Sequence, residues 1–377
     1  MHRPPPASAF TSASAPAQQD AVWRATAPGT ARYRERHARR FARDFFRAGL
    51  SGLSLSSIGI GTYLGEDSDA DDIAYADAVR RAVASGVNVV DTAINYRCQR
   101  SERAIGRALH GAFIGGEVSR DEIVVCTKGG YIPLDGYPPS SPEGYQGYLR
   151  REFYARNVMR PQDVVSGGHC LTPDFLGECV ARSRANLGLD AIDVYYLHNP
   201  EQQLAAVSYD ELLDRLRAAF QCLEECVERG DVGVYGCATW QGLRVEPGAR
   251  GHLSLADLVQ LAREVAGESH HFKVVQLPIN LAMPEAVRVP TQRLPSGAVV
   301  PVLEAARELG LSVVASASLM QSQLAANLPD PVREIFPSLT TDAQRAIAFV
   351  RSLPGVTTAL VGMKKVVHVD ENLGAAR

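Results

Sequence analysis

The sequence has no long apolar run and no surplus of basic residues. No segment approaches the roughly 18–20 consecutive apolar residues that a membrane-spanning helix needs. The formal net charge is −3, whereas a dedicated nucleic-acid-binding protein usually carries a basic surplus. The seven cysteines are odd in number and scattered through apolar stretches, which is typical of reduced thiols. We therefore expect a soluble, cytoplasmic globular protein that binds neither membrane nor nucleic acid.

The first 45 residues differ in composition from the rest of the chain. They contain eight arginines, no lysine and three acidic residues, so that they carry +5 while the remaining residues carry −8. Residues 1–21 are rich in Pro, Ala, Ser and Gln and lack the apolar core of a secretory signal. We predict that residues 1–45 form a basic, partly disordered extension. An organelle transit peptide is the alternative, because such peptides are also rich in Arg and Ser and poor in acids.

After Phe45, eight short β-branched segments alternate with amphipathic segments. The predicted strands are residues 56–62, 86–92, 122–128, 192–198, 231–238, 273–279, 311–317 and 357–362. Between them apolar residues recur at helical spacing, and most of these helical segments end in Gly, a common helix terminator. Nearly continuous apolar strands joined by helices predict a parallel sheet covered by helices. Eight such units favour a closed (β/α)₈ TIM barrel over residues 46–377.

One interval between predicted strands is much longer than the others. Glu122 and Ile192 begin consecutive strands 70 residues apart, so we place an insertion at about residues 129–165. It contains six aromatic residues and four arginines, and Pro and Gly interrupt it repeatedly. Loops that follow barrel strands border the active site, so we predict a lid over bound substrate that favours bulky, aromatic or anionic compounds. The alternative is a Tyr-rich loop packed outside the barrel, with at most one short helix near residues 149–158.

Four ionisable side chains stand at or just after the ends of three consecutive strands. Asp91 ends the second strand, Tyr96 follows five residues later, and Lys128 and His198 end the third and fourth. These ends meet at one mouth of a barrel. A nearby ammonium lowers a tyrosine pKa from about 10, so Lys128, held by Asp91, would make Tyr96 a general acid. His198 would orient a carbonyl oxygen. No Ser or Cys there is paired with a base, so a cofactor must supply the reacting group.

Four sequence motifs occur in a fixed order, one per strand. They are FRAGLSGLSLSSIGIGTY, DTAINYRCQRSERAIGRAL, IVVCTKGG and LGLDAIDVYYLHNP. In that order they resemble the N-terminal hairpin with first strand, the Asp–Tyr segment, the lysine strand and the histidine segment of the aldo-keto reductase superfamily. The resemblance spans about residues 46–372. It implies that Asp91, Tyr96, Lys128 and His198 form a catalytic tetrad, and that the enzyme reduces a small aldehyde or ketone with a nicotinamide cofactor and no metal.

The same resemblance implies where the cofactor binds. Gln276 would hold the nicotinamide, whereas the Ser-Asn pair of the family falls on Ala238 and Thr239, and its stacking aromatic falls on Ser316. Lys364, Lys365 and His368 would clamp a 2′-phosphate, so we expect NADP (NADPH) rather than NAD. The predicted cofactor residues are Thr239, Gln276, Ser316, Leu319, Gln321, Gly362, Lys364, His368, Glu371 and Asn372. The predicted substrate residues are Tyr63, Tyr131 and Trp240.

Other signals in the sequence point to weaker hypotheses. The glycines at 59, 61 and 65 are spaced one residue too far apart for a Rossmann fingerprint. Cys222 and Cys226, and the pair His270–His271, lack the neighbouring ligands of a metal site. His169 is either a loop residue or, less favoured, a substrate contact. The alternative function is a nucleotide-binding regulatory barrel with little turnover. The loss of the Ser-Asn pair favours this alternative, whereas the intact tetrad argues against it.

Overall fold

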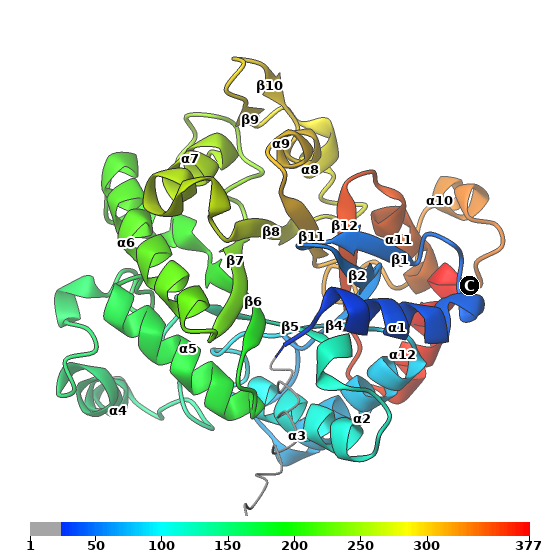
Figure 1. Ribbon diagram of the computed structural model, residues 1–377, viewed down its shortest axis with the longest axis horizontal. Helices are drawn as coiled ribbons and strands as arrows, with labels where there is room; N and C mark the ends of the chain where they lie inside the picture. Colours follow the sequence, from blue (N-terminus) through cyan, green and yellow to red (C-terminus); the bar gives the residue numbers. More distant parts are fainter. Residues whose placement is uncertain (1–23) are drawn as a thin grey trace, which may run out of the picture.

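The computed structural model describes residues 24–377, in which eight parallel strands close into a barrel (Figure 1). Each strand lies within or overlaps one of the eight predicted segments, so the predicted TIM barrel is confirmed. The last strand pairs with the first, in register Leu360 with Gly59. In barrel order the strands are β3 (Ile58–Gly61), β4 (Val89–Asp91), β5 (Val124–Gly129), β6 (Ile192–His198), β7 (Val232–Ala238), β8 (Phe272–Pro278), β11 (Ser312–Ser316) and β12 (Val356–Gly362).

Helices surround the barrel and cover the outer faces of its strands (Figure 1). Serine side chains cap the amino ends of α2, α6 and α7, and left-handed glycines end α2 and α5, as the sequence pattern predicts. The helices are α2 (Asp69–Ser85), α3 (Arg100–Ile114), α5 (Pro173–Leu187), α6 (Tyr209–Glu228), α7 (Leu255–Ala266), α8 (Glu285–Arg288), α9 (Val302–Glu308), α10 (Asp330–Ile335), α11 (Asp342–Ser352) and α12 (Val366–Asn372).

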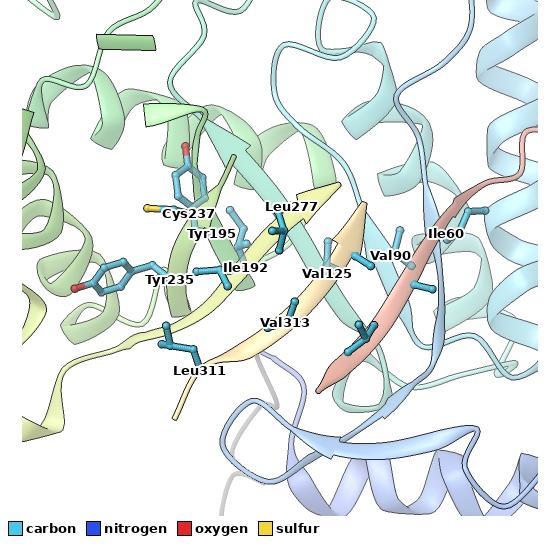
Figure 2. Packing of buried hydrophobic residues seen from close by; sticks show 14 of the residues in the cluster. Ile60, Val90, Val125, Ile192, Tyr195, Tyr235, Cys237, Leu277, Leu311 and Val313 are labelled. Atoms are coloured by element: carbon cyan, nitrogen blue, oxygen red, sulfur yellow. The ribbon is translucent and has the colours of Figure 1, made fainter. Parts of the chain in front are cut away.

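Two apolar clusters alternate along the strands. Val90 and Val125 belong to a large cluster between the strands and the helices, part of which Figure 2 shows. Their neighbours Val89 and Val124 belong to a smaller cluster that fills the barrel interior. Successive strand residues point to opposite faces, so nearly continuous apolar runs supply both layers. No helix of the described residues is long and apolar enough to cross a membrane.

The amino-terminal end of the barrel is covered by the predicted hairpin, β1 (Phe46–Gly49) and β2 (Leu53–Ser56), and by helix α1 (Ala27–His37). Residues 24–45, which the sequence analysis assigns to a separate extension, therefore pack against the amino-terminal end of the barrel. Tyr33 is fully buried and its hydroxyl donates to the carbonyl of Val87, while Arg36 forms a double hydrogen bond with Glu122. The expectations of disorder and of a transit peptide for residues 1–23 lie outside the described residues.

The helical part of the insertion after β5 packs against helix α5 on the outside of the barrel. Its helix α4 (Pro142–Leu149) begins where Ser141 caps Gly144, and a π-helical turn at residues 150–154 continues it. The helix predicted near residues 149–158 thus begins several residues earlier than expected, at Pro142. Ser141 and Pro142 are a helix start signal that the prediction did not include. Phe153 of this segment is buried against Phe175 of α5, and Arg156 pairs with Glu178.

The buried carboxylate of Asp193 joins the amino-terminal segment to the barrel, so its removal should destabilise the protein. One oxygen accepts from the amide of Ala25 at 2.7 Å, and the other accepts from the amide of Val125 and from Arg120. We predict that Asp193→Ala lowers the free energy of unfolding by about 3–5 kcal/mol, because it leaves a cation and two amides unpaired. Urea unfolding measures this. The control is Asp190→Ala at an exposed neighbour; equal stability of both variants would contradict the assignment.

Candidate active site

A cavity of about 420 Å³ opens at the carboxyl ends of the barrel strands. This is the end at which barrel enzymes place their chemistry. Most of the predicted site residues line it, and the strands and the loops that follow them supply these residues from opposite sides of the mouth. The predicted residues in the lining are Tyr63, Asp91, Tyr96, Tyr131, His198, Thr239, Trp240, Gln276, Ser316, Leu319, Gln321 and Gly362.

A buried ion pair lies at the base of this cavity, with Asp91 in the cavity lining and Lys128 beneath it. The Lys128 ammonium donates to Asp91 Oδ1 at 2.6 Å and to the carbonyl of Thr92 at 2.7 Å, and it is 1% exposed. Asp91 Oδ2 accepts from Gln276 Nε2 at 2.8 Å, so both carboxylate oxygens are engaged. Burial raises the pKa of Asp91 against the opposing effect of Lys128, while the pKa of Lys128 is raised by Asp91 although burial opposes it. The ammonium is therefore held charged beside the cavity.

Tyr96 lies directly beside this ammonium, with Lys128 Nζ 5.0 Å from the centre of its ring. Burial raises the pKa of Tyr96 above its usual value of 10, and the charge of Lys128 opposes that rise only in part. The predicted lowering of this pKa toward neutrality is therefore wrong. The cost of burying a phenolate outweighs the effect of the lysine on this pKa, and that cost is not visible in the sequence around Tyr96. Tyr96 remains a protonated phenol at neutral pH.

His198 completes the arrangement from the end of β6. Its ring lies 5.8 Å from that of Tyr96 and 4.9 Å from that of Tyr131, both edge-on. Burial, helped by Lys128 and His169, holds the pKa of His198 well below its usual value of 6.5. The imidazole is therefore neutral at pH 7. The four predicted catalytic side chains thus converge on one point at the cavity floor.

The cavity wall also offers hydroxyl groups that have no hydrogen-bond partner among the described residues 24–377. Thr239 Oγ1 and Ser318 Oγ are buried and make no hydrogen bond, and both residues line the cavity. Buried hydroxyls are almost always hydrogen-bonded in proteins, so these two suit a polar ligand. Gln276 uses its amide nitrogen on Asp91 and keeps its carbonyl oxygen for another partner. The donor set therefore fits the carboxamide of a nicotinamide.

A model of the Aldo/keto reductase family matches residues 57–247, half of the chain. The chain belongs to the aldo/keto reductase family. Two curated relatives match part of this aldo/keto reductase. A D-threo-aldose 1-dehydrogenase from a Pseudomonas species is 32% identical over 45% of this chain and 49% of its own length. An NADH-specific methylglyoxal reductase from Escherichia coli K12 is 28% identical over 40% of each chain. The matches thus span half or less of the relatives' lengths.

Solved structures share the fold of this aldo/keto reductase over most of its length. An aldo/keto reductase from Klebsiella pneumoniae in complex with NADP and acetate has a TM-score of 0.58 and 19% identity, covering 88% of this chain and 89% of its own. An aldo-keto reductase from Bacillus halodurans in its holo form has a TM-score of 0.54 and 18% identity, covering 88% and 90%. At these identities the likeness shows the fold.

The predicted 2′-phosphate clamp of this aldo/keto reductase differs from expectation. Lys364 does not line the cavity, and its ammonium is bound by both oxygens of Asp71, at 2.8 Å each. Lys365 and His368 are exposed beside it. Asp71 stands in the first turn of α2, a segment distant in sequence, and this is why the pattern around Lys364 alone did not reveal the pairing.

The last two predicted cofactor residues also lie outside the cavity lining. Asn372 is buried at the end of α12, and the carbonyl of Glu371 accepts from Gln344. His169, the less favoured substrate contact, does not line the cavity either. Lys128 lies beneath the floor rather than on it.

Several residues of the cavity lining were not predicted from the sequence. Asn95 and Asn199 line the cavity next to Tyr96 and His198. Asn199 Nδ2 donates to the Tyr131 hydroxyl at 3.0 Å. Asn199 has φ 49°, in the left-handed region that asparagine tolerates better than most residues. An Asn directly after the last residue of a barrel strand is thus a signal that could have been used. The loop 317–322 also lines the cavity, with φ values of 53° and 72° at Gln321 and Ser322.

The buried neutral histidines should make stability depend on pH in the acid range. Burial lowers the pKa of His169 to about 4, whereas the unfolded chain titrates near 6.5. Between these values the unfolded state binds more protons, so acidification should lower the free energy of unfolding. Each such histidine contributes about 1.4 kcal/mol per pH unit. Urea unfolding from pH 6.5 to 4 measures the slope. His169→Gln should make it shallower, and the exposed His110→Gln should not; parallel slopes for all three would contradict the shift.

Proposed function

We propose that this aldo/keto reductase reduces an aldehyde or ketone to an alcohol with a nicotinamide nucleotide. The observation that carries the proposal is the buried Lys128–Asp91 pair, in which Lys128 Nζ lies 5.0 Å from the centre of the Tyr96 ring. When bound, the reduced nicotinamide supplies a hydride to the carbonyl carbon. Thr239, Gln276 and Ser318 would hold it through their free oxygens. The groups that bind the carbonyl oxygen and give it a proton belong to the protein.

Tyr96 is the proposed proton donor. Because burial keeps its pKa above 10, the phenol holds a proton for the developing alkoxide. The Lys128 ammonium stabilises the phenolate that remains, and Asp91 keeps that ammonium in place. His198 is neutral, so it can hydrogen-bond the carbonyl oxygen without adding a second positive charge beside Lys128. The positive charge of Lys128 is thus placed to stabilise the negative charge that Tyr96 carries after it has given up its proton.

The proposed substrate is a neutral carbonyl compound. Tyr63, Tyr131 and Trp240 supply aromatic surface around the cavity, and Asn95 and Asn199 supply amides. No Lys or Arg of the described residues lines it, so an anionic substrate would find no partner for its charge. This replaces the anionic preference expected from a lid. Three of the four arginines of the insertion form ion pairs with acidic residues outside the cavity lining, namely Arg151, Arg156 and Arg160.

A regulatory role with little turnover is the second candidate. The observation that favours it is Ala238, which lines the cavity at the position where the family's pair of polar residues begins and offers no side-chain hydrogen bond. A weakly held nicotinamide would bind without efficient hydride transfer. This candidate predicts nucleotide binding with negligible carbonyl reduction by the unmodified protein.

The proton donor can be tested by removing one oxygen. We predict that Tyr96→Phe reduces kcat for aldehydes by about 10²–10⁴-fold and leaves nucleotide affinity unchanged. Oxidation of NADPH followed at its near-ultraviolet absorbance gives kcat, and nucleotide fluorescence gives the Kd. The matched control is Tyr137→Phe, at an exposed tyrosine of the insertion. A Tyr96→Phe enzyme as fast as the parent would show that another group donates the proton.

For the cofactor we propose NADPH, with Lys364 and Lys365 meeting the 2′-phosphate in competition with Asp71. Replacing both lysines by Ala should weaken NADPH more than NADH, because only NADPH carries that phosphate. Asp71→Asn should tighten NADPH about fivefold, the effect of one partly exposed ion pair, and leave NADH unchanged. Fluorescence titration with both nucleotides measures this.

The carboxylate of Asp370, which pairs with Arg81 on the neighbouring helix, provides the control. Asp370→Asn should alter neither affinity. Equal changes for NADPH and NADH in the lysine and Asp71 variants would mean that this loop does not read the 2′-phosphate.

A further inference from the structure

His169 is a buried histidine that the proposed mechanism does not use. It lies between the insertion and α5, is 1% exposed, and stands behind His198 rather than in the cavity. Its Nε2–H donates to the backbone carbonyl of His198 at 2.8 Å. It therefore reaches the active site through the main chain of the histidine that faces the substrate.

Within residues 24–377, no hydrogen bond to the ring of His198 fixes its orientation. Its Nδ1 is buried without a partner in the described part of the chain. A functional imidazole is usually oriented by a hydrogen bond from its second nitrogen. Here the restraints are the edge-on contacts with Tyr96 and Tyr131, the pairing of the His198 main chain with β7, and the bond from His169 to the His198 carbonyl. The backbone anchor is consequently more important than in a histidine held at its ring.

His169 is itself held rigidly from the side away from the cavity. Gln203 Nε2 donates to His169 Nδ1 at 2.7 Å, and Arg215 on α6 donates to the side-chain oxygen of Gln203. Because Gln203 is a donor here, Nδ1 must be the acceptor, which leaves the proton on Nε2 for the His198 carbonyl. A directed series of hydrogen bonds thus runs from Arg215 to the end of β6.

The same histidine also restrains the cavity wall next to His198. Its ring packs edge-on against Tyr131 at 5.0 Å, and Tyr131 accepts from Asn199, the residue after His198. Gly130 passes so close that a Cβ there would lie 3.1 Å from His169 Nε2 and 2.9 Å from the His198 carbonyl oxygen. The segment 198–199, with Asn199 in the left-handed region, is therefore fixed on both sides by groups around His169.

We propose that His169 is a positioning residue, which sets the orientation of His198 toward the substrate oxygen through the hydrogen bond to the His198 carbonyl. The expected change in kcat rests on the proposed carbonyl reduction, whereas the expected orientation of the His198 ring does not. His169→Leu, which removes both hydrogen bonds at similar volume, should lower kcat about tenfold or more and leave NADPH affinity within twofold. His169→Gln, which retains an amide donor, should recover most of the lost kcat.

A double-substitution cycle separates positioning from general damage. In the background of His198→Ala, adding His169→Leu should change kcat by less than about twofold, because the residue through which it acts is gone. An equal tenfold loss in both backgrounds would overturn the proposal. His270→Leu, at another buried histidine with a lowered pKa and no contact with the site, is the control for the loss of a buried imidazole.

A spectroscopic measurement tests the positioning without turnover. In full-length protein labelled with ¹⁵N-histidine, the ring signals of His198 are those absent from His198→Ala. They should shift or broaden in His169→Leu and stay unchanged in His270→Leu. Unchanged signals in His169→Leu would overturn the inference. If the signals move as expected while the parent reduces no carbonyl compound, the proposed function fails and the positioning role stands.

Discussion

The chemistry proposed for this protein depends on one buried ion pair, between Lys128 on β5 and Asp91 on β4. The burial of Lys128, which is 1% exposed, is tolerated only because the Asp91 carboxylate and the Thr92 carbonyl accept hydrogen bonds from its ammonium. The same carboxylate accepts from Gln276, on the far side of the barrel. The pair therefore fixes three strands relative to one another and sets the electrostatic surroundings of Tyr96 and His198. A barrel closed around a charge of this kind has little freedom to rearrange its floor.

The barrel and the four ionisable side chains were predictable because they depend on local patterns. Runs such as 122–128 are apolar on both faces, as a strand between helices and barrel interior requires, and polar residues appear where these runs end. Asp91, Lys128 and His198 occupy the last positions, or next to last, of their strands. A parallel barrel then brings them together without further information.

The parts that could not be predicted depend on partners remote in sequence. The pairing of Lys364 with Asp71, and that of Arg36 with Glu122, join residues separated by 293 and 86 positions. An arginine-rich helix looks solvated until the acidic partners at the base of the barrel are known. The pKa of Tyr96 was misjudged for a related reason, since its burial is a property of the assembled barrel.

The base of the barrel joins the hairpin region to residues about 300 positions later, and this bears on how the protein assembles during synthesis. Arg47 of the hairpin donates to the carbonyl of Val356, 309 residues later, and Arg351 pairs with Asp44. One edge of strand β3 likewise remains unpaired until β12 pairs with it. Contacts of such separation form slowly, so a chain still on the ribosome exposes an unpaired edge of β3 until β12 has emerged. Chaperone protection in that interval would act on β3 and the hairpin beside it.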